Sequence, residues 1–258
     1  MCVFAVAVAA FNNHAAPVLA LDIATGVNGD TGADMGCAGQ VYLTVTFVGL
    51  KSGLFLGEAP GCCGAVRFAG LEIPECYRDE IDAAYRRIDD ELLADALVPR
   101  GRGAHKGDFG HVLVVGGGEG MPGAVRLAGE AALRAGAGRV SIATHPSHAA
   151  IIVASRPELM SHAVASPADL EPLLDKVDVI AFGPGLGQSD WARALFDQLA
   201  DDQRPAVWDA DALNLLAAKP DPAPNRVITP HPGEAGTLLG IGTADIQADR
   251  PAALAALA

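Results

Sequence analysis

The sequence predicts an α/β protein with a mostly parallel sheet, and two observations carry this prediction. From residue 111 onwards, short apolar runs alternate with segments of helical spacing, a pattern typical of parallel sheets covered by helices on both faces. Most of the apolar runs end in loops rich in Gly, Pro or Asp. Because ligands bind at the carboxyl ends of parallel strands, these loops are the expected location of a functional site.

Composition excludes several classes of protein and of partner. Of the 258 residues, 50% are hydrophobic and 19% are charged, which excludes disorder because disordered chains combine low hydrophobicity with high charge. The length allows one large domain or two ordinary ones. A net charge of −13 repels phosphate backbones and anionic lipids, so neither nucleic acid nor a membrane is expected as a partner.

The cysteines and the N-terminal run predict a cytoplasmic protein. The five cysteines fall in the first third of the chain at irregular spacings, with one adjacent pair, and make a poor framework for disulfides or zinc. Residues 1–11 are apolar, but they are too few to span a bilayer and lack the basic start of a signal peptide. We expect a buried helix there.

The first third of the chain also predicts three strands. Residues 17–23 form a short apolar run, residues 41–48 are β-branched and aromatic, and residues 64–71 suggest one more short strand. Asp22 ends the first run and Thr25 follows in the turn. A carboxylate with a hydroxyl and carbonyl groups can bind a hard cation or a ribose.

Two charged features follow the second of these strands. Lys51 is either a snorkelling surface lysine or an anion contact. Between residues 79 and 95, acidic side chains crowd a stretch in which apolar residues recur at helical spacing. We interpret residues 79–99 as an acidic helical linker with a solvated face, which places the first domain at residues 1–78 and the second at residues 100–258.

Strands and helices alternate regularly in the second domain. A helix over residues 122–135 has Pro in its first turn and ends before Gly136, and Ser189 is a candidate N-cap of a later helix. Further helices are expected to end at Ala218 and to begin after Glu234. The predicted strands cover residues 111–115, 139–144, 177–182, 206–208 and 226–229.

Two glycine-rich loops follow predicted strands. Residues 116–123, GGGEGMPG, contain a G-x-G-x-x-G. The next strand, however, ends in Thr144 and His145 without the carboxylate of a dinucleotide-binding unit, and no Lys-Ser/Thr follows for a P-loop. The interpretation that is left is a loop whose backbone a ligand can approach closely, and the alternative is a tight turn without a ligand. Residues 183–187, GPGLG, open a helix whose free amides can hold an anion or a polar ring, and a turn is again the alternative.

Three polar motifs complete the set. Asp209 lies at a strand end and is the stronger functional candidate of its motif, whereas Asp211 is expected to cap the following helix. His231 lies between two prolines at the next strand end, which favours a ligand contact over a merely structural role. Lys106, before the first strand of this domain, either neutralises a phosphate or forms a solvated charge pair.

Together these motifs resemble the bifunctional NAD(P)H-hydrate repair enzymes. The dehydratase domain of that family depends on ADP or ATP and has a ribokinase-like fold, and it is similar in order and spacing to HKGDFGHVLVVGGGEGMPGA, ALRAGAGRVSIAT, PELM, GPGLG, DADALN and TPHPGE. The end of its epimerase domain is similar to LDIATG and TVTFVGLKSGL, within residues 17–76. The resemblance implies a partial Rossmann-like epimerase domain followed by a truncated ribokinase-like domain.

The resemblance also implies chemistry and site residues. ADP or ATP, with magnesium, would phosphorylate the ring hydroxyl of NAD(P)H hydrate, and elimination would restore NAD(P)H, while the epimerase interconverts the two hydrate epimers. Ala124, Gly185 and His231 would contact the hydrate in the dehydratase domain. Asp22 would contact it in the epimerase domain, where Thr25 stands in the place of a potassium-binding serine. The secondary candidates are Lys106, Gly123, Gly187 and Asp209.

Three motifs of that family are missing from this sequence. These are a Gly-Gly-Asp-Gly loop of the epimerase, the lysine-containing nucleotide loop of the dehydratase, and the Gly-Gly-Thr-Gly-Asp motif that carries the catalytic aspartate of the dehydratase. We expect an internal piece of a longer, homo-oligomeric protein, and an isolated chain that is poorly stable or associates because its sheet has an unpaired edge. Three alternatives stay open: a remnant that binds dinucleotide without turnover, a ribokinase-like kinase of a vitamin precursor, and a plain nicotinamide dehydrogenase.

Overall fold

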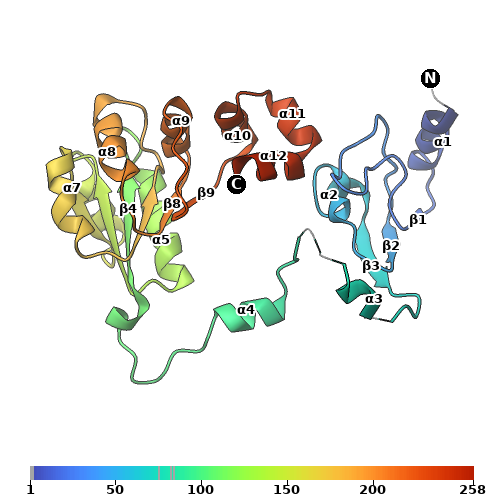
Figure 1. The fold of residues 1–258 in the computed structure, drawn as a ribbon, viewed down its shortest axis with the longest axis horizontal. Helices are drawn as coiled ribbons and strands as arrows, with labels where there is room; N and C mark the ends of the chain where they lie inside the picture. Colours follow the sequence, from blue (N-terminus) through green and yellow to red (C-terminus); the bar gives the residue numbers. More distant parts are fainter. Residues whose placement is uncertain (1–2, 75, 82, 84) are drawn as a thin grey trace. The chain divides into compact units, whose positions relative to one another are not determined.

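The computed structural model describes residues 3–74, 76–81, 83 and 85–258 of the chain. The chain divides into two compact units, which are Met1–Val98 with Ile241–Ala258, and Pro99–Gly240 (Figure 1). No helix in the part of the chain that the structure describes is long and apolar enough to cross a membrane.

The first unit is built on a small parallel sheet. Its strands lie in the order β1 (Leu19–Leu21), β2 (Leu43–Phe47) and β3 (Ala65–Ala69), so the three predicted strands are confirmed with shorter bounds. A small core that includes Leu54 and the buried thiol of Cys62 packs within this unit. The helical segments are α1 (Val3–Asn12), the 3₁₀ helix η1 (Ser52–Leu54), α2 (Ala59–Cys62), α3 (Cys76–Asp79), α4 (Asp90–Ala96), α11 (Thr243–Ala248) and α12 (Arg250–Leu257).

The predicted apolar helix at the N-terminus forms, but it is less buried than expected. Phe4 and Val6 of α1 are 73% and 55% exposed, whereas Val8 is buried. A helix that is apolar all round needs cover on every side. The first unit is small and covers only the side of α1 that carries Val8.

The acidic segment is not one continuous helix, so this prediction is wrong. Residues 81, 83 and 85–89 are not helical, and α4 begins only after Asp89, whose carboxylate accepts a hydrogen bond from the Leu92 amide at 3.0 Å. Carboxylates three and four residues apart repel each other along a helix, and the described apolar side chains here have no core to pack on. The solvated face is confirmed, because every side chain described between residues 80 and 99 is exposed.

The second unit holds a six-stranded sheet in which every neighbouring pair is parallel, as predicted. The order is β6-β5-β4-β7-β8-β9. The predicted strands are all confirmed, and β6 is an addition: it is short, half polar and lies at the sheet edge, so no apolar run marks it. The bounds are β4 (His111–Gly116), β5 (Arg139–Thr144), β6 (Met160–Ala163), β7 (Val179–Phe182), β8 (Ala206–Trp208) and β9 (Arg226–Ile228).

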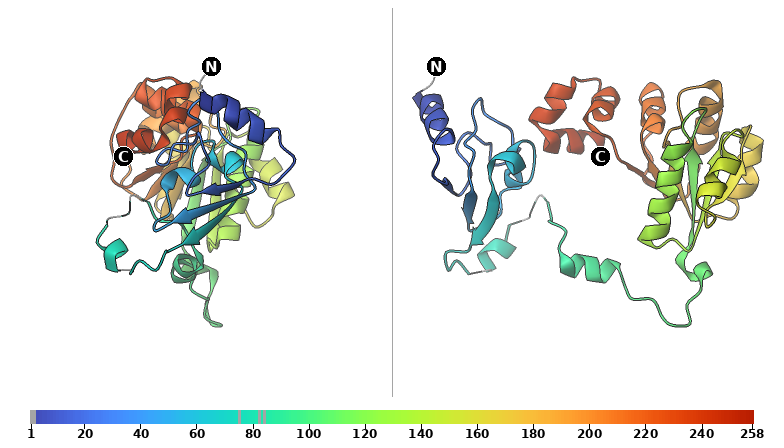
Figure 2. Two further views of the ribbon diagram at one scale, coloured as in Figure 1. Left: turned by 90° about the vertical axis from the view of Figure 1, so that its right-hand side faces the viewer. Right: turned by 180° about the vertical axis from the view of Figure 1, so that it is seen from behind.

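Helices cover both faces of this sheet (Figure 2). Val114 of β4 packs in one core with α5 and α6, whereas Leu113 and Val115 pack in another with α7, α8 and α9. Successive residues of a strand point to opposite faces, so β4 is buried on both. Besides the 3₁₀ helix η2 (Lys106–Phe109), the helices are α5 (Pro122–Ala135), α6 (Ala149–Ser155), α7 (Pro167–Leu174), α8 (Asp190–Ala200), α9 (Asp211–Ala218) and α10 (Pro232–Leu239).

A polar chain crosses three strands inside this unit. Nε2 of His111 lies 2.9 Å from the Ser141 hydroxyl, which lies 3.3 Å from Nε2 of His162. Nδ1 of His111 lies 2.9 Å from the Lys176 carbonyl oxygen. Burial lowers the pKa of both histidines below the usual histidine value, because the interior disfavours the charged imidazolium.

We expect the second unit to lose stability as the pH falls below about 6.5, the ordinary histidine pKa. The two histidines take up protons near pH 6.5 in the unfolded chain, but only at lower pH in the folded chain. The stability of the unit is therefore fully present above about pH 6.5 and falls below it, by an amount on the order of 1 kcal/mol. Urea unfolding at a series of pH values measures this loss. His162→Gln should reduce the loss, and a pH dependence identical to that of the wild type would contradict the assignment.

Candidate functional site

The predicted motifs gather at one edge of the second sheet. Because the strands are parallel, the loops that follow them meet at the carboxyl edge. The loops that follow β4, β7, β8 and β9 carry the two glycine motifs, the aspartate motif and the His231 motif, respectively.

The two glycine loops are locked to each other through their backbones. The Gly117 amide donates to the Pro184 carbonyl at 3.0 Å, and the Gly118 amide donates to the Gly185 carbonyl at 2.7 Å. A Cβ atom added to Gly118 would lie 2.4 Å from the Leu186 carbonyl oxygen. Both loops are therefore tight turns, and they are also places where only backbone atoms fit.

This contact brings two of the predicted substrate-binding residues together. A Cβ atom added to Gly185, whose φ is +58°, would lie 2.8 Å from Cβ of Ala124 and 3.0 Å from Cβ of Met121. Gly123 precedes Ala124 in the first turn of α5, and no described atom lies within 4 Å of the position of its missing Cβ. The start of α5 is therefore open to a ligand beside Gly185.

The aspartate motif follows β8 with a strained backbone. Oδ1 of Asp209 accepts a hydrogen bond from the Thr229 hydroxyl at 2.9 Å. Ala210 has a φ of 51° and a ψ of −121°, a conformation that non-glycine residues rarely adopt and that is enriched at functional sites. Asp211 is not the N-cap of α9, so this prediction is wrong: its Oδ2 accepts a hydrogen bond from the Gly187 amide at 2.8 Å and ties the motif to the second glycine loop.

His231 has a structural role at the start of α10. Its Nδ1 accepts hydrogen bonds from the amides of Gly233 at 2.9 Å and Glu234 at 3.3 Å, and Oε2 of Glu234 accepts one from the His231 amide at 2.8 Å. The buried Glu234 also places Oε1 3.2 Å from Nε2 of His231. The imidazole is two-thirds exposed, at 67%, so capping and the contact with Glu234 leave much of the ring accessible to a ligand.

Lys106 does not join this group. It lies in η2, directly before β4, and the carbonyl of Phe109 in the same turn accepts a hydrogen bond from the Gly138 amide, directly before β5. Both positions are at the amino ends of their strands. The structure therefore places Lys106 at the opposite edge of the sheet from Ala124, Gly185 and His231.

A pocket of about 420 Å³ opens at the carboxyl edge, between the loops after β4, β5 and β7. Of the predicted site residues, Gly187 lines this pocket. The pocket is also lined by three side chains that were not selected as site candidates from the sequence, which are His145, Asp190 and Trp191. His145 directly follows a predicted strand and Trp191 follows GPGLG closely, and these positions were the available signal. Its lining includes Glu119, Met121, His145, Gly187, Asp190 and Trp191.

In the first unit the structure joins Asp22 to Lys51. Oδ1 of Asp22 accepts hydrogen bonds from the Lys51 ammonium group, from the Thr46 hydroxyl at 3.1 Å and from the Phe47 amide at 3.1 Å. The hydrogen bond from Lys51, followed by those from Phe47 and Thr46, lowers the pKa of Asp22 against the opposing effect of burial. Lys51 is thus neither a free surface lysine nor a free anion contact. Both Asp22 and Val48, at the ends of neighbouring strands, have positive φ values, 71° and 63°.

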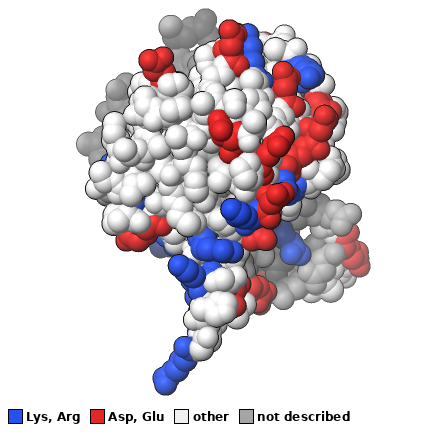
Figure 3. Space-filling view, turned by 90° about the vertical axis from the view of Figure 1, so that its left-hand side faces the viewer, with Lys and Arg blue, Asp and Glu red and all other residues white. Residues whose placement is uncertain are grey.

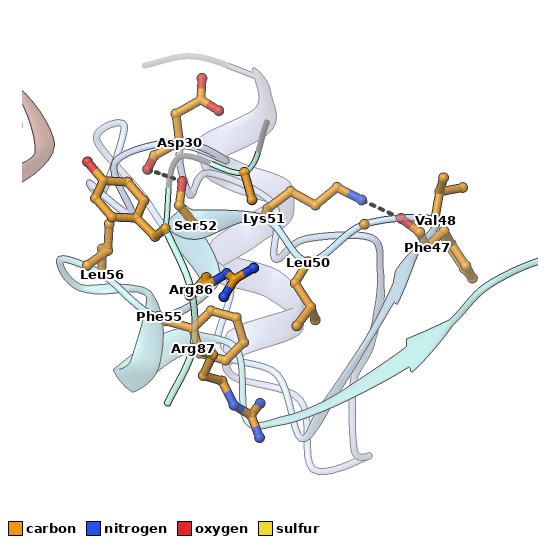
Figure 4. Close-up of a pocket in the computed structure, with 13 residues that line it drawn as sticks. Asp30, Phe47, Val48, Leu50, Lys51, Ser52, Phe55, Leu56, Arg86 and Arg87 are labelled. Atoms are coloured by element: carbon orange, nitrogen blue, oxygen red, sulfur yellow. Dashed lines mark hydrogen bonds between the residues drawn. The ribbon is translucent and has the colours of Figure 1, made fainter. Parts of the chain in front are cut away.

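A second pocket of about 710 Å³ lies beside this ion pair (Figure 4). Its wall is mainly apolar and aromatic, with Lys51, Arg86 and Arg87 as cations, and Arg87 lies 5.7 Å from the centre of the Phe55 ring. Figure 4 labels Arg86 among the residues that line this pocket. The lining includes Phe47, Val48, Lys51, Phe55, Arg86 and Arg87.

Thr25 offers an oxygen ligand but no complete metal site. Its side chain is exposed, its hydroxyl has no hydrogen-bond partner among the described residues, and its carbonyl accepts a hydrogen bond from the Gly39 amide at 2.8 Å. No group of three or more His, Cys, Asp or Glu side chains in the described parts of the chain is close enough to hold a metal ion. A cation here would depend on hydroxyl and carbonyl oxygens, which suit a hard ion.

We expect Lys51→Met to raise the pKa of Asp22, since it removes the main group that favours the carboxylate. NMR titration of the labelled aspartate carboxyl carbons measures this. Lys219→Met is the matched control, because Lys219 pairs with Asp197 in the second unit at 3.2 Å. An unchanged Asp22 titration in Lys51→Met would show that the ion pair does not form in solution.

Charged side chains of both signs are interspersed on part of the surface. On the face drawn in Figure 3, acidic and basic side chains lie beside one another around a large uncharged area.

Several solved structures have a fold similar to that of this chain. A hypothetical protein from Streptococcus mutans, SMU.573, aligns with a TM-score of 0.59 at 33% identity over 66% of this chain and 64% of its own. The ADP/ATP-dependent NAD(P)H-hydrate dehydratase from Bacillus subtilis, co-crystallized with ATP/Mg2+, aligns with a TM-score of 0.53 at 30% identity over 63% of this chain and 58% of its own. A ribokinase-like superfamily protein from Enterococcus faecalis, with a TM-score of 0.58 at 24% identity over 64% of this chain and 60% of its own, shows the fold alone.

Sequence comparisons agree. The bifunctional NAD(P)H-hydrate repair enzyme of Coxiella burnetii is 46% identical over 94% of this chain, and that of Escherichia coli is 43% identical over 93%. The chain spans about half the length of these curated relatives, 50% and 46%. A family model for the YjeF-related protein N-terminus matches residues 3–53, and one for NAD(P)H-hydrate dehydratase matches residues 112–258. Because the second match covers more than half of the chain, the chain belongs to the NAD(P)H-hydrate dehydratase family.

Proposed function

We propose that the second unit contributes to the ADP- or ATP-dependent dehydration of NAD(P)H hydrate to NAD(P)H. The nucleotide phosphorylates the ring hydroxyl and elimination of phosphate restores the reduced ring. The observation that supports this best is the pair of backbone hydrogen bonds between the two glycine loops, which brings Gly185 against Ala124 beside the open position at Gly123. Ala124, Gly185 and His231 contact the hydrate in this proposal, with Gly123, Gly187 and Asp209 nearby.

The same proposal assigns residues 1–78, which lie in the first unit, to the epimerase part of the repair enzymes. Asp22 contacts the hydrate there, and the Thr25 hydroxyl is one ligand of a potassium ion. The boundaries that we propose are residues 1–78 for the epimerase part, 79–99 for the linker and 100–258 for the dehydratase part. The strained backbone at Asp22 and its ion pair with Lys51 support a functional role for this strand end.

Magnesium in this proposal arrives with the nucleotide. The described side chains offer no acidic cluster that could hold the ion by itself, and Mg²⁺ commonly binds through substrate phosphates and water with few protein ligands. We also propose a homo-oligomeric parent protein in the cytoplasm. Exposed Leu19 and Leu21 on β1 and the free thiols of Cys62 and Cys63 support these two points.

The expected result is binding of NAD(P)H hydrate with nucleotide-dependent recovery of reduced-cofactor absorbance. Calorimetry with the hydrate alone measures binding, and absorbance after addition of ADP or ATP with Mg²⁺ measures turnover. Binding without recovery would favour the alternative that this chain holds the dinucleotide but does not convert it. Absence of both would contradict the proposal for this chain.

A further inference from the structure

The pocket of about 420 Å³ at the carboxyl edge contains a fixed aromatic corner. Nε1 of Trp191 donates a hydrogen bond to the Val164 carbonyl at 2.8 Å, and the indole packs on the core beneath it. The His145 ring stands almost perpendicular to it, with 5.7 Å between ring centres and an interplanar angle of 82°. Because its polar atom is already bonded, the indole is held in one orientation and presents apolar surface to the pocket.

The polar groups of this pocket are mostly hydrogen-bond acceptors. The carboxylates of Glu119 and Asp190 have no hydrogen bond or ion pair with any described residue, and no Lys or Arg is among the described residues that line the pocket. Such a lining repels a phosphate group. It suits a neutral planar ring whose amino group or ribose hydroxyls donate hydrogen bonds.

The pocket is also next to the proposed hydrate site, within the same unit. Met121 lines it and lies 3.0 Å from the position of a Cβ atom on Gly185, and Gly187 lines it two residues later. A dinucleotide has two nucleosides joined by a pyrophosphate. One nucleoside can therefore lie at Ala124 and Gly185 while the other reaches this pocket.

We propose that this pocket is a nucleoside subsite in which an adenine ring packs against Trp191 and the Glu119 and Asp190 carboxylates accept hydrogen bonds from the ribose or the adenine amino group. It deepens the proposed function, since it assigns a place to the half of the dinucleotide that does not react. The volume of about 420 Å³ lies within the usual range of small-ligand pockets.

The two tryptophans of the chain give a direct test. Trp191 lies in the pocket, whereas Trp208 is 2% exposed in the core. Titration of the whole chain with adenosine should quench tryptophan fluorescence saturably, and Trp191→Phe, which leaves only Trp208, should abolish the change. Trp208→Phe is the matched variant and should keep it. Absence of quenching in the wild type, or equal quenching in Trp191→Phe, would overturn the proposal.

Two further measurements separate this inference from the proposed function. Glu119→Gln should weaken adenosine binding about fivefold by calorimetry, which does not depend on the fluorophore. NAD(P)H hydrate should compete with adenosine. If the hydrate binds while adenosine does not, the subsite is wrong and the proposed function stands. If adenosine binds as described while the hydrate neither binds nor reacts, the nucleoside site is supported and the proposed function fails.

Discussion

Gly183→Ala is expected to destabilise the second unit by about 3 kcal/mol or more. A Cβ atom at this position would lie 1.8 Å from the Asp209 carbonyl oxygen and 2.7 Å from Cβ of Ala212. The φ of Gly183 is +119°, which strains any residue with a side chain. The Asp209 carbonyl oxygen and Cβ of Ala212 cannot move aside as the end of a flexible side chain can. The loop after β7 and the loop after β8 would therefore have to separate.

Urea unfolding of the purified chain measures this loss, and Gly123→Ala is the matched control. The Cβ position of Gly123 meets no described atom within 4 Å, and its φ is not positive. Because Ala favours a helix over Gly, this control should be neutral or more stable by up to about 1 kcal/mol. A Gly183→Ala variant with the unfolding midpoint of the wild type would show that the two loops are not in contact as described.

Hydrophobic periodicity was sufficient to predict the sheet of the second unit. Each confirmed strand there is a short apolar run, and α5 has Pro in its first turn and a left-handed Gly136 at its end. Periodicity was insufficient where tertiary context decides. β6 is too short and too polar to be recognised as an apolar run. The acidic segment has the spacing of a helix, but its described side chains between residues 80 and 99 are all exposed and so lack apolar cover.

The convergence of the motifs at one sheet edge could be predicted from the sequence, whereas the hydrogen-bond partners of their residues could not. Strand ends of a parallel sheet converge, so motifs after strands were expected to meet. The partner of a side chain depends on contacts across the sequence: Asp211 bonds to Gly187, and Lys51 bonds to Asp22, 29 residues away. Local rules offered a helix cap for Asp211, and either a surface position or an anion contact for Lys51.

His231 is a residue in which structural and functional roles can be separated. Its Nδ1 caps α10 through the Gly233 and Glu234 amides, and the side chain as a whole is 67% exposed. Asn is a good N-cap because its side-chain oxygen can accept the same hydrogen bonds, whereas Ala cannot. We therefore expect His231→Ala to lose about 1 kcal/mol of stability and His231→Asn to lose a few tenths.

If His231 contacts the hydrate, both variants lose that contact, because neither carries an imidazole. The affinity for NAD(P)H hydrate, measured by calorimetry without nucleotide, should then fall about tenfold in both, which corresponds to about one hydrogen bond. A role confined to capping predicts a different pattern, in which affinity is normal in His231→Asn and stability alone falls in His231→Ala. Measuring urea unfolding and hydrate affinity on the same two variants decides between these roles, because stability follows the cap and affinity follows the imidazole.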